Sequence, residues 1–463
     1  MNTAQVLVEL LKEYQVRHIF GVPGDTTMPL YDALYGARGE ITHIMARDER
    51  SASFMADAYA RLSGKPGITE APSGGGATYV VPGVAEATGS SVPMVVFTSD
   101  VPVVDEGKGT LTAIDQQQLL RAAVKWSGVV RRPQMLADVV RRAFRAATSG
   151  RGGAAHVVLP EDVLAEVYGG PAMYAEAGCR TYPSYRTQAP RADLEAILAA
   201  LLSAQRPVIV AGGGVVLSGA WDEVTRMAEL LHIPVATTIN GKGSINEMHE
   251  WSIGVIGGNG ARPYANQVLA ESDCIFYLGT KVNSLVTLSN TIPASGQPVV
   301  VLQLNVDPLE LGNNVPTTVA ACGDIKESLA ALLAIAAERG VTAPVRQRSS
   351  AVLAPRAEEF WREVASYSSC ADVPVSPQRL VSELWQQTPQ DVVVVADPGT
   401  MTPLTAAQFR TRRPGRSVVI PRAHGGLGYA LPATVGAAYA RPGERIVGLV
   451  GDGSFGMSGT ELA

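Results

Sequence analysis

The chain has 463 residues, which at about 150 residues per domain suggests about three domains. Hydrophobic residues make up 46% and charged residues 17%, a balance that suits a globular protein with large cores and excludes a disordered chain. The net charge of −5 comes with no basic block, which argues against nucleic acid as a partner.

The cysteines and the apolar runs limit where the protein works. Four cysteines, Cys179, Cys274, Cys322 and Cys370, are far apart and form no CxxC pair, which is typical of a reducing compartment. The amphipathic start of the chain is not a signal peptide, and no apolar stretch reaches 18 residues, so a membrane partner is excluded. We therefore expect a cytoplasmic protein.

Short β-branched runs alternate with helical patterns from one end of the chain to the other. The first helix is predicted within residues 1–16, where apolar residues keep helical spacing. Strands are predicted at residues 18–20, 94–97, 156–159, 208–210, 274–278, 299–302, 392–395 and 446–450. Several are continuous apolar runs, as in parallel strands covered by helices on both faces. The sequence predicts an α/β fold of three consecutive doubly wound, mainly parallel-sheet domains.

Two segments interrupt this alternation and suggest domain limits. Residues 168–190 lack periodicity and are rich in Gly, Pro and Tyr, and residues 342–376 read as a second, partly helical linker. The resulting domains are 1–167, 191–341 and 377–463. The third is short and stops one turn into a predicted helix, so we expect a C-terminally truncated chain whose last domain is incomplete.

A glycine-flanked acid follows the last predicted strand. Gly451, Asp452, Gly453 and Ser454 stand where a strand passes into a helix, so the backbone can approach a ligand and the helix N-terminus can face an anion. A carboxylate cannot bind phosphate directly, but it can hold Mg²⁺ that bridges to a diphosphate. The alternative is an ordinary Asp-Gly turn.

Further motifs stand in the same order as in a known superfamily. They are Gly21–Gly24 (GVPG), Arg47–Arg50 (RDER), Ser73–Thr78 (SGGGAT) and His424–Pro432 (HGGLGYALP). Together with the Gly-Asp-Gly-Ser turn, the chain resembles thiamine diphosphate (ThDP)-dependent enzymes of the acetolactate synthase and benzoylformate decarboxylase superfamily. The resemblance implies a pyrimidine-binding first domain, a central Rossmann-like domain and a third domain that binds diphosphate and Mg²⁺.

The resemblance assigns a proton-transfer role to Glu49. In this family, a glutamate at this position hydrogen-bonds N1′ of the cofactor's aminopyrimidine and so helps to remove the proton from thiazolium C2. A carboxyl group in an apolar pocket suits that task, because desolvation raises its pKa. The alternative is a surface acid paired with Arg47 or Arg50.

Other family positions concern cofactor binding. Leu427 matches the bulky residue that wedges under the cofactor, and the backbone of Gly425 and Leu427 matches the contacts to the aminopyrimidine edge. Gly24 lies in the first motif, and Gly399 and Thr400 match the loop near the diphosphate and pyrimidine. The alternative for Leu427 is an ordinary core residue.

In the resembled family a 2-oxo acid loses CO₂, and the product is either released as an aldehyde or ligated to a second carbonyl compound. Asp25 favours release, whereas the histidines favour ligation. Asp25 follows the GVPG motif, where 2-oxo acid decarboxylases more often carry a polar residue, and it could shuttle a proton to the reacting carbon. Its alternative is a helix N-cap. No two histidines are adjacent and none lies between His43 and His156, so the site lacks the family's usual histidine proton donors. This lack favours carboligation.

The central domain contains the position at which members of the resembled family contact a flavin. The segment Gly279–Ser284 matches the family's flavin-contacting segment but has lost its arginines and aspartates. This loss favours the absence of FAD and leaves bound FAD as an alternative.

The leading interpretation is a ThDP- and Mg²⁺-dependent enzyme that decarboxylates a 2-oxo acid and ligates the product, similar to acetolactate synthase. It implies small-molecule 2-oxo acid substrates, a homodimer or homotetramer, and a second metal ligand beyond residue 463. One alternative is a 2-oxo acid decarboxylase that releases an aldehyde without ligation. The other is a non-catalytic nucleotide- or flavin-binding module.

Overall fold

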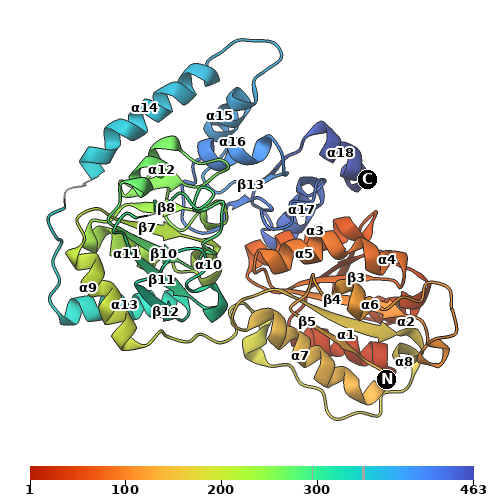
Figure 1. Cartoon of the computed structure of the whole chain (residues 1–463). Helices are drawn as coiled ribbons and strands as arrows, with labels where there is room; N and C mark the ends of the chain where they lie inside the picture. Colours follow the sequence, from red (N-terminus) through yellow and green to blue (C-terminus); the bar gives the residue numbers. More distant parts are fainter. Residues whose placement is uncertain (295, 347–349) are drawn as a thin grey trace. The chain divides into compact units, whose positions relative to one another are not determined.

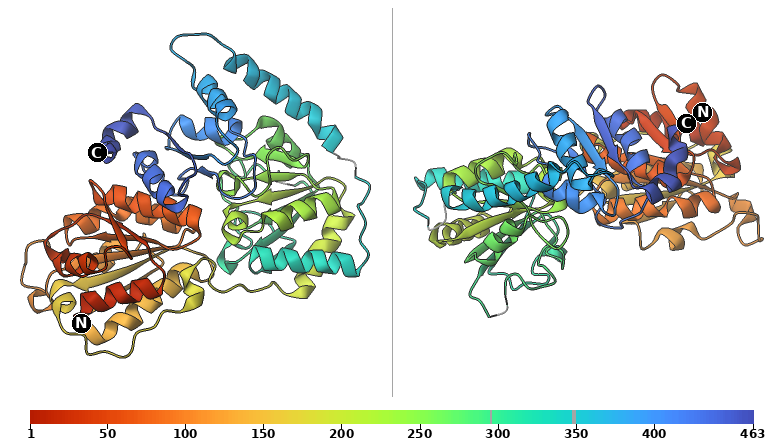
Figure 2. Two further views of the ribbon diagram at one scale, coloured as in Figure 1. Left: turned by 180° about the vertical axis from the view of Figure 1, so that it is seen from behind. Right: turned by 90° about the horizontal axis from the view of Figure 1, so that it is seen from above.

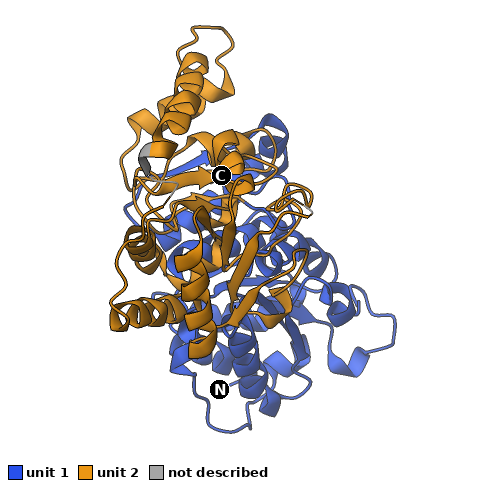
Figure 3. Ribbon diagram, turned by 60° about the vertical axis from the view of Figure 1, so that its left-hand side comes forward, with its two compact units in different colours: residues 1–185, 421–463 blue, residues 186–420 orange. Residues whose placement is uncertain are grey.

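A computed structural model describes residues 1–294, 296–346 and 350–463 (Figure 1). The chain forms two compact units, which are coloured separately in Figure 3. The first unit comprises residues 1–185 and 421–463, and the second comprises residues 186–420. In the part of the chain that the structure describes, no helix is long and apolar enough to cross a membrane.

The first unit is built around a sheet of six parallel strands. Its strands are β1 (His18–Gly21), β2 (Thr42–Met45), β3 (Gly67–Ala71), β4 (Met94–Asp100), β5 (Trp126–Val129) and β6 (Ala154–Pro160). Their order across the sheet is β2-β1-β3-β4-β6-β5. The direction in which successive strands are added changes between β1 and β3, as it does in doubly wound sheets. Ligands of such sheets bind at the carboxyl ends of the strands.

Helices cover both faces of this sheet. The helices of the first unit are α1 (Thr3–Glu13), α2 (Met28–Gly36), α3 (Glu49–Ser63), α4 (Gly75–Tyr79), α5 (Val81–Gly89), α6 (Gln116–Leu120), α7 (Leu136–Thr148), α8 (Glu161–Ala165), α17 (Ala430–Ala440) and α18 (Asp452–Ser458). Figures 1 and 2 show helices on either side of the strands. Because strand side chains alternate, Val95 and Phe97 join the core with α1 and α7, whereas Met94 and Val96 join the core with α3 and α5. The strand β15 (Ile446–Leu449) lies between α17 and α18 in the chain.

The second unit repeats the plan. Its strands are β7 (Pro207–Ala211), β8 (Val235–Thr237), β9 (Ser252–Val255), β10 (Cys274–Leu278), β11 (Val300–Asn305) and β12 (Val319–Cys322). They form a second parallel sheet in the order β12-β11-β10-β7-β8-β9. Its helices are α9 (Arg191–Ser203), α10 (Gly213–Ser218), α11 (Trp221–Leu231), α12 (Pro263–Ala270), α13 (Ile325–Glu338), α14 (Ser350–Ser368), α15 (Pro377–Gln387) and α16 (Met401–Gln408).

A third, small sheet contains the short strands β13 (Val393–Ala396) and β14 (Val418–Val419), which pair in parallel. The predicted α/β fold of three parallel-sheet domains is therefore confirmed, with the last sheet the smallest. Each predicted strand overlaps an observed one, and the partly helical segment 342–376 contains α14. The exact domain limits remain predictions.

Local signals fix where α3 begins and ends. The Asp48 side chain accepts a hydrogen bond from Ser51 N at 2.7 Å, which caps the helix N-terminus. At the other end Gly64 has φ +70°, the left-handed conformation that glycine adopts without strain. These caps place Glu49 at the first residue of the helix.

A buried ionic cluster ties α16 to the second sheet. Glu247 pairs with Lys242 at 2.6 Å and with Arg262 at 2.7 Å, and all three side chains are buried. Lys242 Nζ also donates to Ala406 O and Arg262 Nε to Ala407 O, both at 3.0 Å. Cations at these carbonyls match the negative end of the helix dipole. The cluster therefore holds the helix that follows Gly399 and Thr400.

Candidate functional site

Three segments of the first unit converge around the start of α3. Glu461 accepts a hydrogen bond from Arg47 N at 3.0 Å, and Arg50 donates to Met457 O at 2.8 Å. A β-carbon built on Gly428 would lie 3.2 Å from Met457 Cβ. The structure therefore brings together the start of α3, the loop of residues 422–428 and α18.

Glu49 is buried at this junction, with 8% of its surface exposed. Burial raises the pKa of its carboxyl group, and the negative charges of Asp48 and Glu70 raise it further. Arg50 pairs with Asp48 instead, and no ion pair of Glu49 exists among the described residues. The alternative of a surface acid paired with Arg47 or Arg50 is therefore wrong.

The glycine-rich motif lies beside Glu49, and Gly76 is the residue of this motif that leaves space for the Glu49 carboxylate. A β-carbon built on Gly76 would lie 3.0 Å from Glu49 Oε1 and 2.6 Å from Pro72 Cδ. Any side chain at residue 76 would therefore press on the Glu49 carboxylate. The Ser73–Thr78 motif gives this carboxyl group the space that it occupies.

A second buried acid, Glu70, lies near Glu49 and was not predicted from the sequence. Glu70 lies on β3 and bonds to Tyr31 and to His43, whose Nε2 is 3.2 Å from Glu70 Oε1. A β-carbon on Gly21 would overlap this carboxylate, at 1.9 Å from Oε1. The available signal was an acid in the middle of the otherwise uncharged strand GITEA.

The loop before α17 carries Gly425 and Leu427, the two residues predicted to contact the aminopyrimidine. Gly425 is exposed and has φ +71°, so glycine is the residue that fits this backbone. Leu427 is 47% exposed, which makes the alternative of an ordinary core residue wrong. A large apolar side chain held in the open beside Glu49's helix is available to a ligand.

The Gly-Asp-Gly turn opens into free space. Gly451 caps α18, and Asp452 is the exposed first residue of this helix. A β-carbon on Gly451 or Gly453 would meet nothing within 4 Å, whereas Ser454 is buried against the helix's own unit. This open, glycine-lined turn leaves room for a ligand at the carboxylate.

The single carboxylate at the Gly-Asp-Gly turn fits a Mg²⁺ ion whose other contacts come mainly from a bound diphosphate and water. Among the residues that the structure describes, no group of three His, Cys, Asp or Glu side chains could hold a metal ion. Mg²⁺ is commonly bound by one or two carboxylates together with substrate phosphates and water. A single exposed Asp452 beside an open turn is compatible with that mode and not with a cage made only of protein ligands.

Gly24 and Asp25 lie at the carboxyl end of β1. A β-carbon on Gly24 would lie 2.5 Å from Pro72 Cβ, so close packing requires the glycine. Asp25 is the exposed first residue of a 3₁₀ turn, Asp25–Thr27, whose N-cap is Gly24. The alternative of Asp25 as a helix N-cap is therefore wrong.

The remaining predicted residues belong to the second unit. Gly399 is exposed with φ +116°, and Thr400 stands directly before α16. In the central domain, a β-carbon on Gly214 would lie 2.8 Å from Gly279 Cα. Packing between these two turns accounts for both glycines without a nucleotide.

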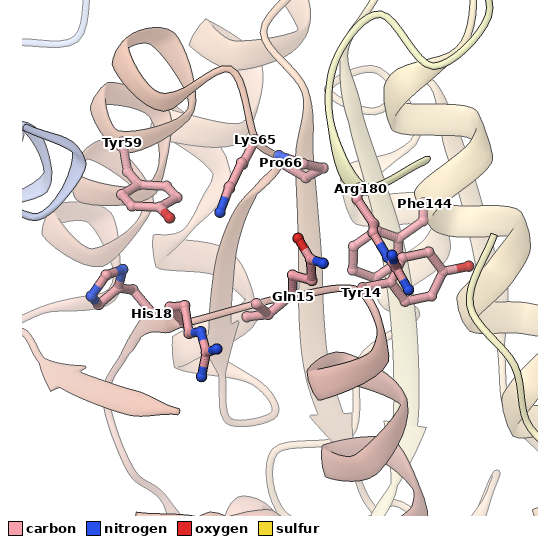
Figure 4. Close-up of a pocket in the computed structure, with 10 residues that line it drawn as sticks. Tyr14, Gln15, His18, Tyr59, Lys65, Pro66, Phe144 and Arg180 are labelled. Atoms are coloured by element: carbon pink, nitrogen blue, oxygen red, sulfur yellow. The ribbon is translucent and has the colours of Figure 1, made fainter. Parts of the chain in front are cut away.

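A pocket of the first unit is lined by residues from the first sheet and its helices (Figure 4). Its lining residues include Tyr14 and Phe144, whose rings stack at 3.8 Å between centroids. Two of its cations bind backbone carbonyls, Arg17 that of Glu40 and Arg180 that of Glu13. The pocket contains none of the predicted site residues, and its two arginines serve the local fold.

Three family models match the chain in order. They are the thiamine pyrophosphate enzyme N-terminal TPP binding domain at residues 1–119, the central domain at residues 194–332 and the C-terminal TPP binding domain at residues 397–463. TPP is another abbreviation for ThDP.

Curated proteins resemble the chain over its whole length. A probable acetolactate synthase large subunit from Methanocaldococcus jannaschii is 32% identical and covers 100% of this chain and 78% of its own length. The acetolactate synthase large subunit of Lactococcus lactis is 31% identical, over 99% of this chain and 77% of its own length. That of Parasynechococcus marenigrum is 34% identical, over 100% and 73% respectively.

Proposed function

We propose that this chain, which belongs to the thiamine pyrophosphate enzyme family and is a ThDP-dependent enzyme of the carboligase type, decarboxylates a 2-oxo acid with the help of Mg²⁺ and joins the product to a second carbonyl compound. The observation that carries the proposal is the burial of Glu49, without an ion pair among the described residues, beside the 422–428 loop and α18.

Each part of the site supports one task. Glu49, with its raised pKa, can hold or release a proton at the aminopyrimidine N1′ atom. The exposed Leu427 can support the cofactor's shape, and Asp452 can hold Mg²⁺ against the diphosphate at the open turn. When bound, ThDP supplies the carbon nucleophile and accepts the electrons released with CO₂.

His156, the next histidine in the chain after His43, supports carboligation. His156 is buried between Thr98 Oγ1 at 2.7 Å and Ser127 Oγ at 3.1 Å, and burial lowers its pKa to about 4. It is therefore neutral near pH 7 and a poor proton donor. Slow protonation of the reacting carbon gives a second carbonyl compound time to react.

The exposed carboxylate of Asp25 favours a second candidate function, simple decarboxylation. Because Asp25 does not cap a helix, its carboxyl group is available for proton transfer at the carboxyl end of β1. Prompt protonation would release an aldehyde instead of a ligated product. The non-catalytic alternative is not supported, because all three parts of the chain match enzyme domains.

The function is tested with a panel of 2-oxo acids of increasing side-chain size, in the presence of ThDP and Mg²⁺. CO₂ and ligated product are measured in the same reactions. We expect about one molecule of CO₂ to be released for each molecule of ligated product. Aldehyde without ligated product would support the Asp25 route, and failure of ThDP to bind would contradict the proposal as a whole.

We also propose that the protein assembles as a homodimer or homotetramer. In the family, the first domain of one subunit usually faces the third domain of its partner, so that the junction of α3, the 422–428 loop and α18 seen within this chain would there be formed between two subunits. We expect sedimentation velocity to show a dimer or tetramer, and a monomer that turns over substrate would contradict this assembly.

A further inference from the structure

The loop that carries Gly425 and Leu427 is anchored by a buried carboxylate from another part of the first unit. Glu86 on α5 is fully buried. Its carboxylate accepts hydrogen bonds from the backbone N–H groups of four consecutive residues, with shortest distances of 3.1 Å from Arg422, 3.1 Å from Ala423, 2.7 Å from His424 and 3.3 Å from Gly425. Successive N–H groups that converge in this way form an anion-binding concavity.

The same carboxylate is joined to α3 and to α5. Arg61 Nη2 donates to Glu86 Oε1 at 2.9 Å, and Ser90 Oγ donates to the same oxygen at 2.7 Å. Burial alone would raise the pKa of Glu86, but Arg61 and the N–H groups of the loop lower it below its usual value. Glu86 is therefore an anion near neutral pH.

A second branch of this network holds the other end of the loop. Arg61 Nε donates to Asp57 Oδ2 at 2.7 Å, and the Tyr429 hydroxyl donates to the same oxygen at 2.6 Å. Residues 422–425 and Tyr429 are thus fixed by one buried network, and the segment between them reaches the surface at Leu427. Both ends of the exposed segment are held while its middle stays open.

The loop needs such an anchor because its own backbone offers little support. It lies between β14 and α17 and forms neither helix nor strand. Gly425 and Gly428 both have positive φ, at +71° and +80°, and glycines add conformational freedom. Several charge-assisted hydrogen bonds to one buried carboxylate restrict that freedom.

We propose that Glu86 is a positioning residue that holds the 422–425 backbone in the single conformation that presents Gly425 and Leu427 to the cofactor. This inference rests on the proposed function, because the loop's ligand is the aminopyrimidine of ThDP. Glu86 does not contact that ligand; it acts through the loop's backbone.

Backbone hydrogen exchange tests the anchor without any cofactor. In the wild-type protein we expect the amides of residues 422–425 to be protected although they lie outside helices and strands. In Glu86→Gln, one acceptor oxygen is replaced by the NH₂ of a side-chain amide, which faces N–H donors. The backbone N–H groups of residues 422–425 should therefore exchange about tenfold faster or more. Exchange of these wild-type amides at the rate of an open chain would overturn the anchor, and this measurement does not depend on the variant folding.

Asp324→Asn is the matched control. Asp324 is a buried carboxylate of the second unit that pairs with Arg186 at 2.9 Å and accepts from Glu327 N at 3.1 Å. Its replacement removes a comparable buried charge. We expect it to leave the exchange of residues 422–425 unchanged, and equal acceleration in both variants would show a general loss of stability and overturn the specific anchor.

The cofactor part is tested with ThDP and Mg²⁺ as the probes. A misplaced loop should raise the ThDP dissociation constant of Glu86→Gln about tenfold and slow C2 hydrogen exchange of bound ThDP by about 10- to 100-fold. Unchanged values in a folded variant with faster loop exchange would overturn the positioning role. If the wild type itself fails to bind ThDP, the proposed function fails, while the amide exchange still judges the anchor.

Discussion

Glu49→Gln is expected to bind ThDP nearly as well as the wild-type protein and to turn over substrate about 10²- to 10⁴-fold more slowly. Binding depends chiefly on the diphosphate and Mg²⁺ near Asp452, at the other end of the cofactor. Glutamine can still form a hydrogen bond in the space beside Gly76, but it cannot hold or release the proton. The variant therefore separates binding from activation.

The decisive measurement is C2 hydrogen–deuterium exchange of ThDP bound to each protein. The control is Glu161→Gln, which neutralises the first residue of another helix, α8. We expect slow exchange in Glu49→Gln only. Equal exchange rates in the wild-type and Glu49→Gln proteins would withdraw the assignment of Glu49.

The same variant should stabilise the protein without cofactor. Because the folded pKa of Glu49 is raised, the folded state keeps this proton to higher pH than the unfolded chain does. Protonated Glu49 contributes its full stabilisation below the pKa that glutamate has in the unfolded chain, about 4.3. This stabilisation is lost as the pH rises through the higher pKa of Glu49 in the folded protein. Urea unfolding should therefore show Glu49→Gln more stable than the wild-type protein near neutral pH, with the difference vanishing at acid pH.

Asp452→Ala is expected to weaken Mg²⁺-dependent ThDP binding by more than about 100-fold. Asp452 is the sole carboxylate at the open Gly-Asp-Gly turn, so its loss leaves the metal without this protein charge. The fold should persist, because Asp452 is exposed.

Thermal unfolding with and without ThDP and Mg²⁺ measures this effect, because a ligand that binds only the native state must stabilise it. Asp222→Ala is the control, since Asp222 is an exposed acid in the first turn of α11. We expect the ligands to stabilise the wild type and the control but not Asp452→Ala. Full stabilisation of Asp452→Ala would remove Asp452 from the metal site.

The sequence predicted central strands such as β4, β6, β7 and β10 because burial on both faces leaves continuous apolar runs, whereas the buried central strands β3 and β8 were not predicted. β10 is the clearest example, since its predicted and observed limits coincide at Cys274–Leu278 and all its residues are buried. The edge strand β5 was missed because WSGV is half-exposed and contains glycine. β9 was missed because Gly254 and an irregular register interrupt its pattern.

The candidate site was predictable where its residues form local motifs. Glu49, Leu427 and Asp452 each stand in a short motif with characteristic neighbours. Glu86 could not be found in this way, because its partners lie 336 to 339 residues further along the chain. Within VAEAT on a helix, a single acid reads as part of a solvated face, and only the fold shows that it is buried.

The charged cluster of Lys242, Glu247 and Arg262 has a consequence for cutting the protein into parts. A shortened chain that ends at residue 341 would keep all three side chains but lose the carbonyl groups of Ala406 and Ala407. Two cations would then keep a single anion, lose two of their backbone acceptors and lose part of the cover that buries them. The central sheet is therefore better expressed within the whole second unit, residues 186–420, which includes α16.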